Sequence, residues 1–126
     1  MKNNIIDIVS NRFNSKDKWG LVIGDIMLDH YIIGDVKRLS PEAPVPIVNV
    51  DDNVYKIGGA GNVALNLSGL GINTFIVGEI GNDYSGEVLK DLFKQNGMST
   101  KNLIKKKGPT TTKTRIMGGQ QQMVRL

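Results

Sequence analysis

Asp25 and Asp29 have side chains suited to binding a small, hydroxyl-rich molecule. They follow the apolar run 19–23 and its closing Gly24. Ionised carboxylates accept hydrogen bonds and donate none, so they suit hydroxyl donors such as those of a sugar. Ligands of open parallel sheets lie at the carboxyl ends of the strands, which is where this segment falls. The alternative is a turn-capping Asp25 and a surface Asp29, and the spacing by itself favours neither.

A second segment, residues 58–62, reads Gly-Gly-Ala-Gly-Asn and opens a predicted helix. Glycine permits positive φ angles and lets a ligand approach the backbone closely. The helix after this turn has unpaired N–H groups and the positive end of its dipole there. Gly59 and Asn62 are therefore candidate ligand contacts, because the Asn62 amide both donates and accepts hydrogen bonds. On this segment alone, a tight strand-to-helix turn without a ligand is the simpler interpretation.

The same glycines support a competing interpretation, a nicotinamide- or flavin-binding domain. Residues 59–64 match the fingerprint G-x-G-x-x-A, and Glu79 lies about 20 residues later, where a ribose-binding acid belongs. However, residues 53–57 alternate in polarity, whereas the first strand of such a domain is buried on both faces and reads as an apolar run. A third alternative is a non-catalytic interaction module that self-associates through its β layer.

Four basic residues fall in segments that are predicted to form a β layer. Arginine and lysine bind phosphate through charge-assisted hydrogen bonds, so the four are candidates for contacting a substrate phosphate. They are Arg38, Lys113, Arg115 and Arg125. The solvated face of a β layer is the alternative explanation. The basic run 105–107 is interpreted as a solvated turn, and the single histidine, His30, receives no role.

The composition narrows the class of protein. A chain of 126 residues is one domain by default and can bury a core. The absence of cysteine excludes a disulfide framework, a thiolate zinc site and a cysteine nucleophile. The formal charge is +4, but no aromatic residue interleaves with the basic run, so no nucleic-acid partner is expected. No apolar stretch reaches the roughly 20 residues of a membrane span, and no secretory signal is recognised. A cytoplasmic protein without membrane contact is expected.

Strands and helices alternate along the middle of the chain. Apolar, β-branched and aromatic runs predict two buried strands. Apolar residues at helical spacing predict helices, and Asp83 or Ser85 can cap the longest of them. The ranges are strands 19–23 and 74–77, helices 61–68 and 85–95, and a short N-terminal helix through Ile5, Val9 and Phe13. This alternation favours an α/β fold with a parallel βαβ core.

The remaining segments predict a separate β layer beside this core. Three prolines within residues 41–46 exclude a helix and a central strand. An edge strand is therefore expected over residues 45–50 and a second short strand over 53–57. Residues 110–117 and 121–126 are expected to pair as a hairpin, because two consecutive glycines separate them.

The stretch 58–81 resembles the N-terminal signature of the ribokinase-like (PfkB-type) sugar kinases. It combines a double glycine with Asn62, Ala64, Gly71 and Gly81. Three further segments are similar to the branch of this family that phosphorylates heptose 7-phosphate. They are residues 24–29 (GDIMLD), 38–46 (RLSPEAPVP) and 121–126 (QQMVRL). In many bacteria, this kinase is the first half of a bifunctional ADP-heptose synthase. The resemblance covers nearly the whole chain after about residue 18.

The resemblance implies a ribokinase-like fold with a small β-sheet lid over residues 35–57 and 110–126. It also implies a sugar pocket lined by Asp25, Asp29, Gly59 and Asn62. The implied reaction transfers the γ-phosphate of ATP, assisted by Mg²⁺, to the anomeric hydroxyl of D-glycero-D-manno-heptose 7-phosphate. This is a step toward ADP-heptose and the lipopolysaccharide core. Lids of this family often pair across a dimer, so a homodimer is implied as well.

Members of this family continue well beyond the position of Leu126. Their later half carries a Gly-Ala-Gly-Asp motif, whose aspartate takes the proton from the attacking hydroxyl, and it also holds the ATP site. By resemblance, residues 1–126 are expected to be the N-terminal, sugar-recognition part of a single kinase domain. We expect no catalytic, cofactor-binding or metal-binding residue among them, and no kinase activity from them alone.

Overall fold

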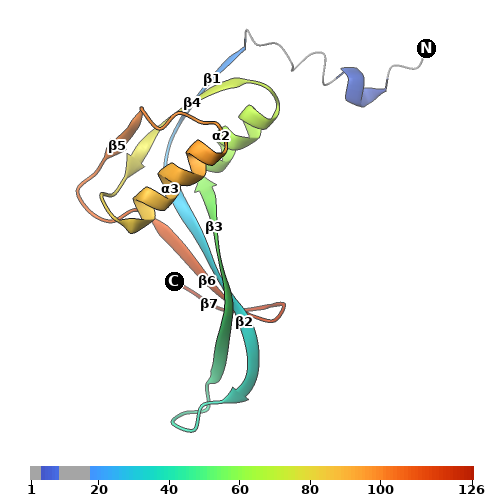
Figure 1. Ribbon diagram of the computed structural model, residues 1–126, viewed down its shortest axis with the longest axis vertical. Coiled ribbons are helices and arrows are strands. Elements are labelled where there is room, and N and C mark those ends of the chain that lie inside the picture. The colour runs from blue at the N-terminus through green and yellow to red at the C-terminus, as the bar shows by residue number, and fades with distance from the viewer. Residues whose placement is uncertain (1–3, 9–17) are drawn as a thin grey trace.

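Two β-sheets and two helices make up the fold in the computed structural model, which describes residues 4–8 and 18–126 (Figure 1). The strands are β1 (Trp19–Ile23), β2 (Ile26–Leu39), β3 (Pro46–Gly59), β4 (Asn73–Ile80), β5 (Leu103–Lys105), β6 (Thr112–Gly118) and β7 (Gln121–Arg125). The helices are α2 (Ala60–Gly69) and α3 (Tyr84–Gln95). Residues 5–8 are also helical, whereas Val9 and Phe13 of the expected N-terminal helix lie outside the described residues.

A three-stranded parallel sheet in the order β1-β4-β5 confirms the expected α/β class. Helix α2 packs on β1 and β4, since small residues leave room for it there. A Cβ at Gly20 would lie 3.3 Å from Ile72 and 3.6 Å from Leu67, which belongs to α2's apolar stripe. The sheet therefore has one face covered by a helix.

The opposite face of this sheet is exposed, which corrects the expectation that residues 19–23 form a buried strand. Trp19, Leu21 and Ile23 are 68%, 62% and 71% exposed, and Trp19 stacks on Phe75 with ring centroids 5.1 Å apart. An apolar run predicts a strand correctly, but burial also needs a covering layer. Within residues 4–8 and 18–126, only the α2 side of β1 has one.

The second sheet is mixed and runs in the order β3-β2-β6-β7. Strands β2 and β3 pair antiparallel over their full lengths, and β2 pairs parallel to β6. The separate strands expected over 45–50 and 53–57 are one continuous strand, β3, because each part finds a partner on β2. Pro46 begins β3 at the sheet edge, where proline is tolerated. The hairpin of β6 and β7 is confirmed.

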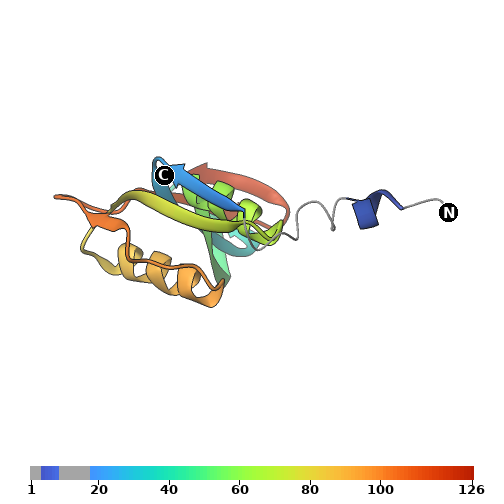
Figure 2. The same ribbon diagram turned by 90° about the horizontal axis from the view of Figure 1, so that it is seen from above.

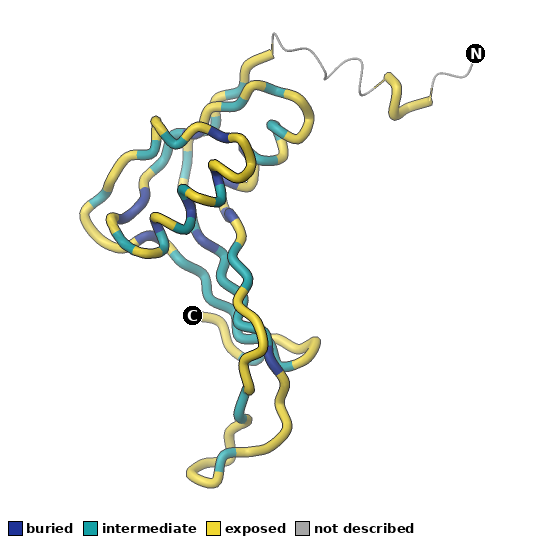
Figure 3. Tube along the Cα trace, viewed as in Figure 1, coloured by how far each residue is buried: buried dark blue, intermediate teal, exposed yellow. Residues whose placement is uncertain are grey.

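The β2–β3 hairpin extends far beyond the helices and ends in an exposed loop (Figures 1 and 3). Its base belongs to the core. Ile26, Leu28 and Ile57 on the base pack in one cluster with the fully buried Leu89 and Phe93 of α3. Seen from above, α3 forms one outer side of the molecule (Figure 2). The second sheet is therefore anchored at one end and free at the other.

The start and stop signals of α3 are confirmed. Asp83 caps its first turn, and Gly97 lies just beyond its end with φ of 70°. By contrast, strand β5 was not predicted, because Lys105 was assigned to a basic turn. No helix of the described residues is long and apolar enough to cross a membrane.

Candidate functional site

A hollow of about 270 Å³ lies at the carboxyl ends of β1, β4 and β5. Its polar lining residues are Asp25, Glu79, Lys106 and Thr111, and its remaining lining residues are Ile23, Gly24, Ile26, Val77, Gly78 and Ile104. Carboxylates and a hydroxyl accept hydrogen bonds, and lysine only donates them. The hollow can therefore bind a molecule that carries hydroxyl groups together with an acceptor or negative charge.

The glycine turn at residues 58–62 holds the backbone of Asp25 in place. The Ala60 N–H donates to the Asp25 carbonyl oxygen at 2.9 Å, which fixes the start of α2 against the end of β1. Gly59 has φ of 59°, and a Cβ there would lie 2.3 Å from the same carbonyl oxygen. Only glycine fits this close approach. The two segments singled out in the sequence are therefore adjacent in space.

Lys106 is a site residue that the sequence analysis missed, because the basic run 105–107 was assigned to solvent. The Lys106 N–H donates to the Ile80 carbonyl oxygen at 2.9 Å, which continues the pairing of β4 with β5. Its Nζ lies 3.4 Å from Thr111 Oγ1, inside the hollow. The apolar residues just before the run are the signal that could have placed Lys106 at a strand end.

One face of the second sheet gathers positive charge. Asp29 of β2 pairs with Lys56 of β3 on one side and with Lys113 of β6 on the other. Two residues along β6, Arg115 lies beside Arg125 of β7. Paired residues of neighbouring strands point to the same face, as do residues two apart in one strand. We call this the cationic face, and its four cations are Lys56, Lys113, Arg115 and Arg125.

Asp29 and Tyr31 organise the cationic face. Arg115 Nη1 donates to Asp29 Oδ1 at 2.6 Å, and both side chains are only 21% exposed. This hydrogen bond raises the pKa of Arg115 above its ordinary value. The Tyr31 ring lies under two cations, 5.0 Å from Arg115 Cζ and 5.4 Å from Lys56 Nζ. Asp29 therefore holds an arginine in place through its Oδ1, and its predicted contact with a sugar is not tested by this arrangement.

The cationic face begins at the rim of the hollow. Thr111 lines the hollow, and its carbonyl oxygen accepts from the Leu28 N–H at 2.9 Å as the chain enters β6. Side chains alternate along an extended chain, so Thr111, Lys113 and Arg115 point to the same side. The hydroxyl-binding and cationic groups therefore form one continuous surface.

Two of the predicted contacts lie elsewhere. Asn62 lines a separate hollow of about 270 Å³ between β3, α2 and α3, together with Tyr55, Lys56, Ile57, Leu65, Leu92 and Asn96. Because α2 already begins at Ala60, Asn62 falls in its first turn, on the side toward α3. Arg38 pairs with Ile47 near the free end of the β2–β3 hairpin. Of the predicted sugar contacts, the hollow's lining includes Asp25 but not Asp29, Gly59 or Asn62, and it does not include Arg38. The roles of all these residues stay predictions.

The structure does not place the glycine fingerprint of the dinucleotide-binding alternative where such a domain needs it. Its fingerprint comes directly after the first strand of a parallel βαβ unit. The strand that precedes Gly59 is β3, which pairs antiparallel with β2 and lies at the edge of its sheet. Glu79 lies in the hollow with Asp25 rather than beside a parallel partner of β3.

Comparison with known proteins gives concordant matches. The sequence profile described as pfkB family carbohydrate kinase matches residues 20–125. "Bifunctional protein HldE" of Methylobacillus flagellatus is 48% identical over 127 residues, covering all of this chain and 26% of that protein. "D-beta-D-heptose 7-phosphate kinase" of Bordetella bronchiseptica is 42% identical over 106 residues, covering 84% of this chain and 34% of that protein. The chain therefore spans about a quarter to a third of the length of these relatives.

Solved structures of similar fold give the same picture. A carbohydrate kinase from Agrobacterium tumefaciens matches with a TM-score of 0.67 and 25% identity, over 86% of this chain and 34% of that one. A fructokinase from Xylella fastidiosa with bound ATP matches with a TM-score of 0.60 and 25% identity, over 79% of this chain and 29% of that one.

Proposed function

Because the chain belongs to the pfkB family of carbohydrate kinases, we propose that it supplies the sugar-recognition part of an ATP-dependent sugar kinase. The proposed acceptor is D-glycero-D-manno-heptose 7-phosphate, phosphorylated at its anomeric hydroxyl on the route to ADP-heptose and the lipopolysaccharide core. The relatives named HldE and heptose 7-phosphate kinase support this substrate. The wider chemistry of a phosphorylated sugar also suits the site, since the molecule carries hydroxyl groups at one part and a dianion at another.

The continuity of the hollow with the cationic face carries the proposal. Asp25 and Thr111 offer acceptors for sugar hydroxyls in the hollow. Lys113 and Arg115 stand next along the same side of β6, where a phosphate attached to that sugar would extend. Three of the four cations expected from the sequence meet here, and the structure adds Lys56 in place of Arg38.

In this mechanism, the residues of the chain bind and orient the acceptor. Holding a hydroxyl in line with the transferring phosphoryl group can lower a barrier by several kcal/mol, roughly 7–11 at most. The β2–β3 hairpin, acting as a lid, would exclude competing water. ATP supplies the phosphoryl group. Within the described residues, no group of three His, Cys, Asp or Glu side chains is placed to hold a metal ion.

The exposed face of β1 offers a surface for packing the rest of such a kinase domain. This face, with Trp19, Leu21 and Ile23, is apolar, and among the described strands β1 lies at the edge of its sheet. Exposed apolar patches of this kind mark contact surfaces. We propose that the aspartate that takes the proton from the attacking hydroxyl, together with the ATP site, belongs to a part of the domain that covers this face. The apolar Leu39 and Val50 near the free end of the hairpin support a homodimer through the lid.

Calorimetry on the full-length kinase tests the proposal. Asp25→Ala should weaken binding of heptose 7-phosphate at least about tenfold and leave ATP binding within about twofold. Lys113→Met should weaken heptose 7-phosphate but not the unphosphorylated heptose. The exposed Lys101→Met serves as a matched control and should change neither. Loss of ATP binding in Asp25→Ala with unchanged sugar binding would overturn the assignment.

A further inference from the structure

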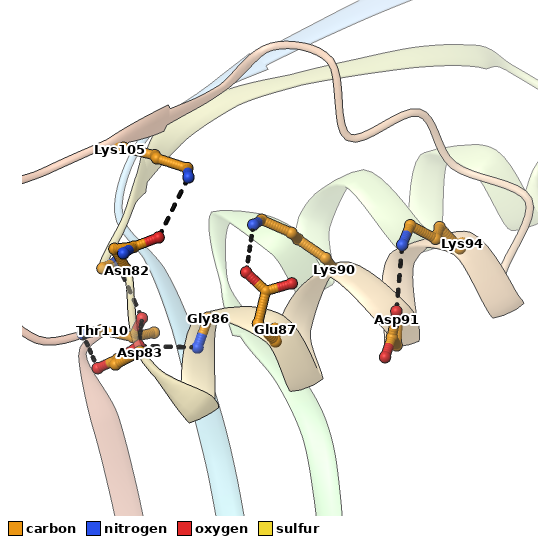
Figure 4. A network of polar contacts seen from close by, with 10 residues as sticks. Asn82, Asp83, Gly86, Glu87, Lys90, Asp91, Lys94, Lys105 and Thr110 are labelled. Atoms are coloured by element: carbon orange, nitrogen blue, oxygen red, sulfur yellow. Dashed lines mark hydrogen bonds and ion pairs between the residues drawn. The ribbon is translucent and has the colours of Figure 1, made fainter.

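A part-buried hydrogen-bond clamp joins the start of α3 to the segment just before β6 (Figure 4). Asp83 Oδ2 accepts from the Thr110 N–H at 2.8 Å. Asp83 Oδ1 accepts from the Thr110 hydroxyl at 2.6 Å and from the Gly86 N–H at 2.9 Å. One carboxylate therefore holds both the first turn of a helix and a residue 27 positions further along the chain.

The clamp is tight and its polar groups are satisfied. Thr110 is 4% exposed, and its Oγ1 accepts from the Gly81 N–H at 2.9 Å while donating to Asp83. Two glycines let the segments approach. A Cβ at Gly81 would lie 2.5 Å from the Thr110 nitrogen, and one at Gly86 would lie 2.4 Å from the Gly81 carbonyl oxygen. Thr110 has little freedom to shift without breaking several hydrogen bonds.

The residues just after Thr110 in the chain belong to the candidate site. Thr111 lines the hollow and contacts Lys106, and Lys113 and Arg115 lie next on the cationic face. Strand β6 begins two residues after Thr110 and pairs with β2 over Thr112–Gly118, directly after the Leu28 N–H donates to the Thr111 carbonyl oxygen. The clamp ties β6 to the start of α3, so a shift of Thr110 would move Lys113 and Arg115 relative to the Asp25 side of the hollow, which belongs to another segment.

We propose that Asp83 and Thr110 are positioning residues for the substrate phosphate. Their hydrogen bonds set where β6 enters the second sheet, and so fix Lys113 and Arg115 relative to the hollow. The inference rests on the proposed function and goes beyond it, because neither residue lies in the hollow or on the cationic face.

The full-length kinase tests this with two variants of one position. Thr110→Val keeps the shape of the side chain and removes the hydroxyl, whereas Thr110→Ser keeps the hydroxyl. We expect Thr110→Val to raise KM for heptose 7-phosphate about tenfold, while KM for ATP and KM for unphosphorylated heptose stay within about twofold. Thr110→Ser should restore KM for the phosphorylated sugar to near the wild-type value.

Two further variants complete the design. Asp83→Asn keeps a helix-capping oxygen but replaces the acceptor of the Thr110 N–H by a donor. It should therefore raise KM for heptose 7-phosphate as Thr110→Val does. This variant tests the proposal if Thr110→Val does not fold. Asn82→Ala removes the neighbouring exposed contact of Lys105 Nζ with Asn82 Oδ1 at 3.1 Å, and should leave every KM unchanged.

The outcomes separate the two proposals. If the wild-type enzyme does not phosphorylate heptose 7-phosphate, the proposed function falls and this inference with it. The wild type can be active while Thr110→Val and Asp83→Asn change KM for heptose 7-phosphate, ATP and unphosphorylated heptose equally, or change only the melting temperature. In either case the positioning role is wrong and the proposed function stands.

Discussion

Replacing Asp83 by alanine removes three hydrogen bonds at once, and its cost in stability can be worked from the structure. The bond from the Gly86 N–H is a helix N-cap, whose loss costs about 1 kcal/mol. The two bonds from Thr110 go to a carboxylate and are part-buried. We count each at about 1 kcal/mol, which is below the usual range for a charged acceptor because the site is partly solvated. The free energy of unfolding should fall by about 3 kcal/mol.

The cost should depend on pH. The Thr110 hydroxyl, then the Thr110 N–H and other backbone N–H groups, lower the pKa of Asp83 below its ordinary 3.8, against a smaller opposing effect of burial. A carboxylate whose pKa is lower in the folded state stabilises the protein at pH values above its unfolded pKa. That stability is lost as pH falls below about 3.8 and through the lowered value. The difference between wild type and Asp83→Ala should therefore be full at pH 7 and shrink at pH 3.

Urea unfolding at pH 7 and pH 3 measures the difference in free energy of unfolding between wild type and Asp83→Ala. At neutral pH, a loss of about 3 kcal/mol corresponds to a fall in melting temperature of roughly 10 °C for a chain of this size. Asp91→Ala is the matched control, because Asp91 pairs with Lys94 on the same helix at 3.2 Å with both side chains over 60% exposed. It should cost less than about 0.5 kcal/mol. A loss of only about 1 kcal/mol in Asp83→Ala, or one that does not change with pH, would refute the reasoning.

Two further predictions concern the helix α2 and the chain as a unit. Gly61→Ala should destabilise by about 1–3 kcal/mol, because its Cβ would lie 2.3 Å from Ile57 Cγ2 and 2.9 Å from Phe93 Cζ. Gly69→Ala, which meets nothing within 4 Å, should be neutral or stabilising by up to about 1 kcal/mol in the same unfolding assay. Residues 1–126 alone should show no ATP turnover with heptose 7-phosphate in a coupled assay, and measurable turnover would contradict our division of the kinase domain.

Local patterns in the sequence predicted the elements that depend on neighbours along the chain. The spacing of apolar residues, Asp83 before a helix and Gly97 after it predicted α3, since capping and helix propensity act within a few residues. The paired glycines predicted the β6–β7 hairpin for the same reason. Asp25 was placed at a strand end, and the structure places it in a hollow there. Short-range chemistry determined these features.

Contacts between distant segments could only be read from the tertiary structure. The parallel pairing of β6 with β2 brings Arg115 to Asp29 across 86 residues, and no local pattern specifies which strands become neighbours. The same applies to Lys106, which lies in the hollow because β5 pairs with β4.

The burial of β1 and the surroundings of Asn62 also depend on tertiary packing. An apolar run fixes that residues 19–23 form a strand, but only the layers packed on the sheet decide which side is covered. Likewise, the glycine turn predicted the start of α2, whereas the position of α3 decided that Asn62 lines a different hollow from Asp25. Amino-acid order sets local conformation directly, while the layers and cavities around a residue arise from all the segments that pack together.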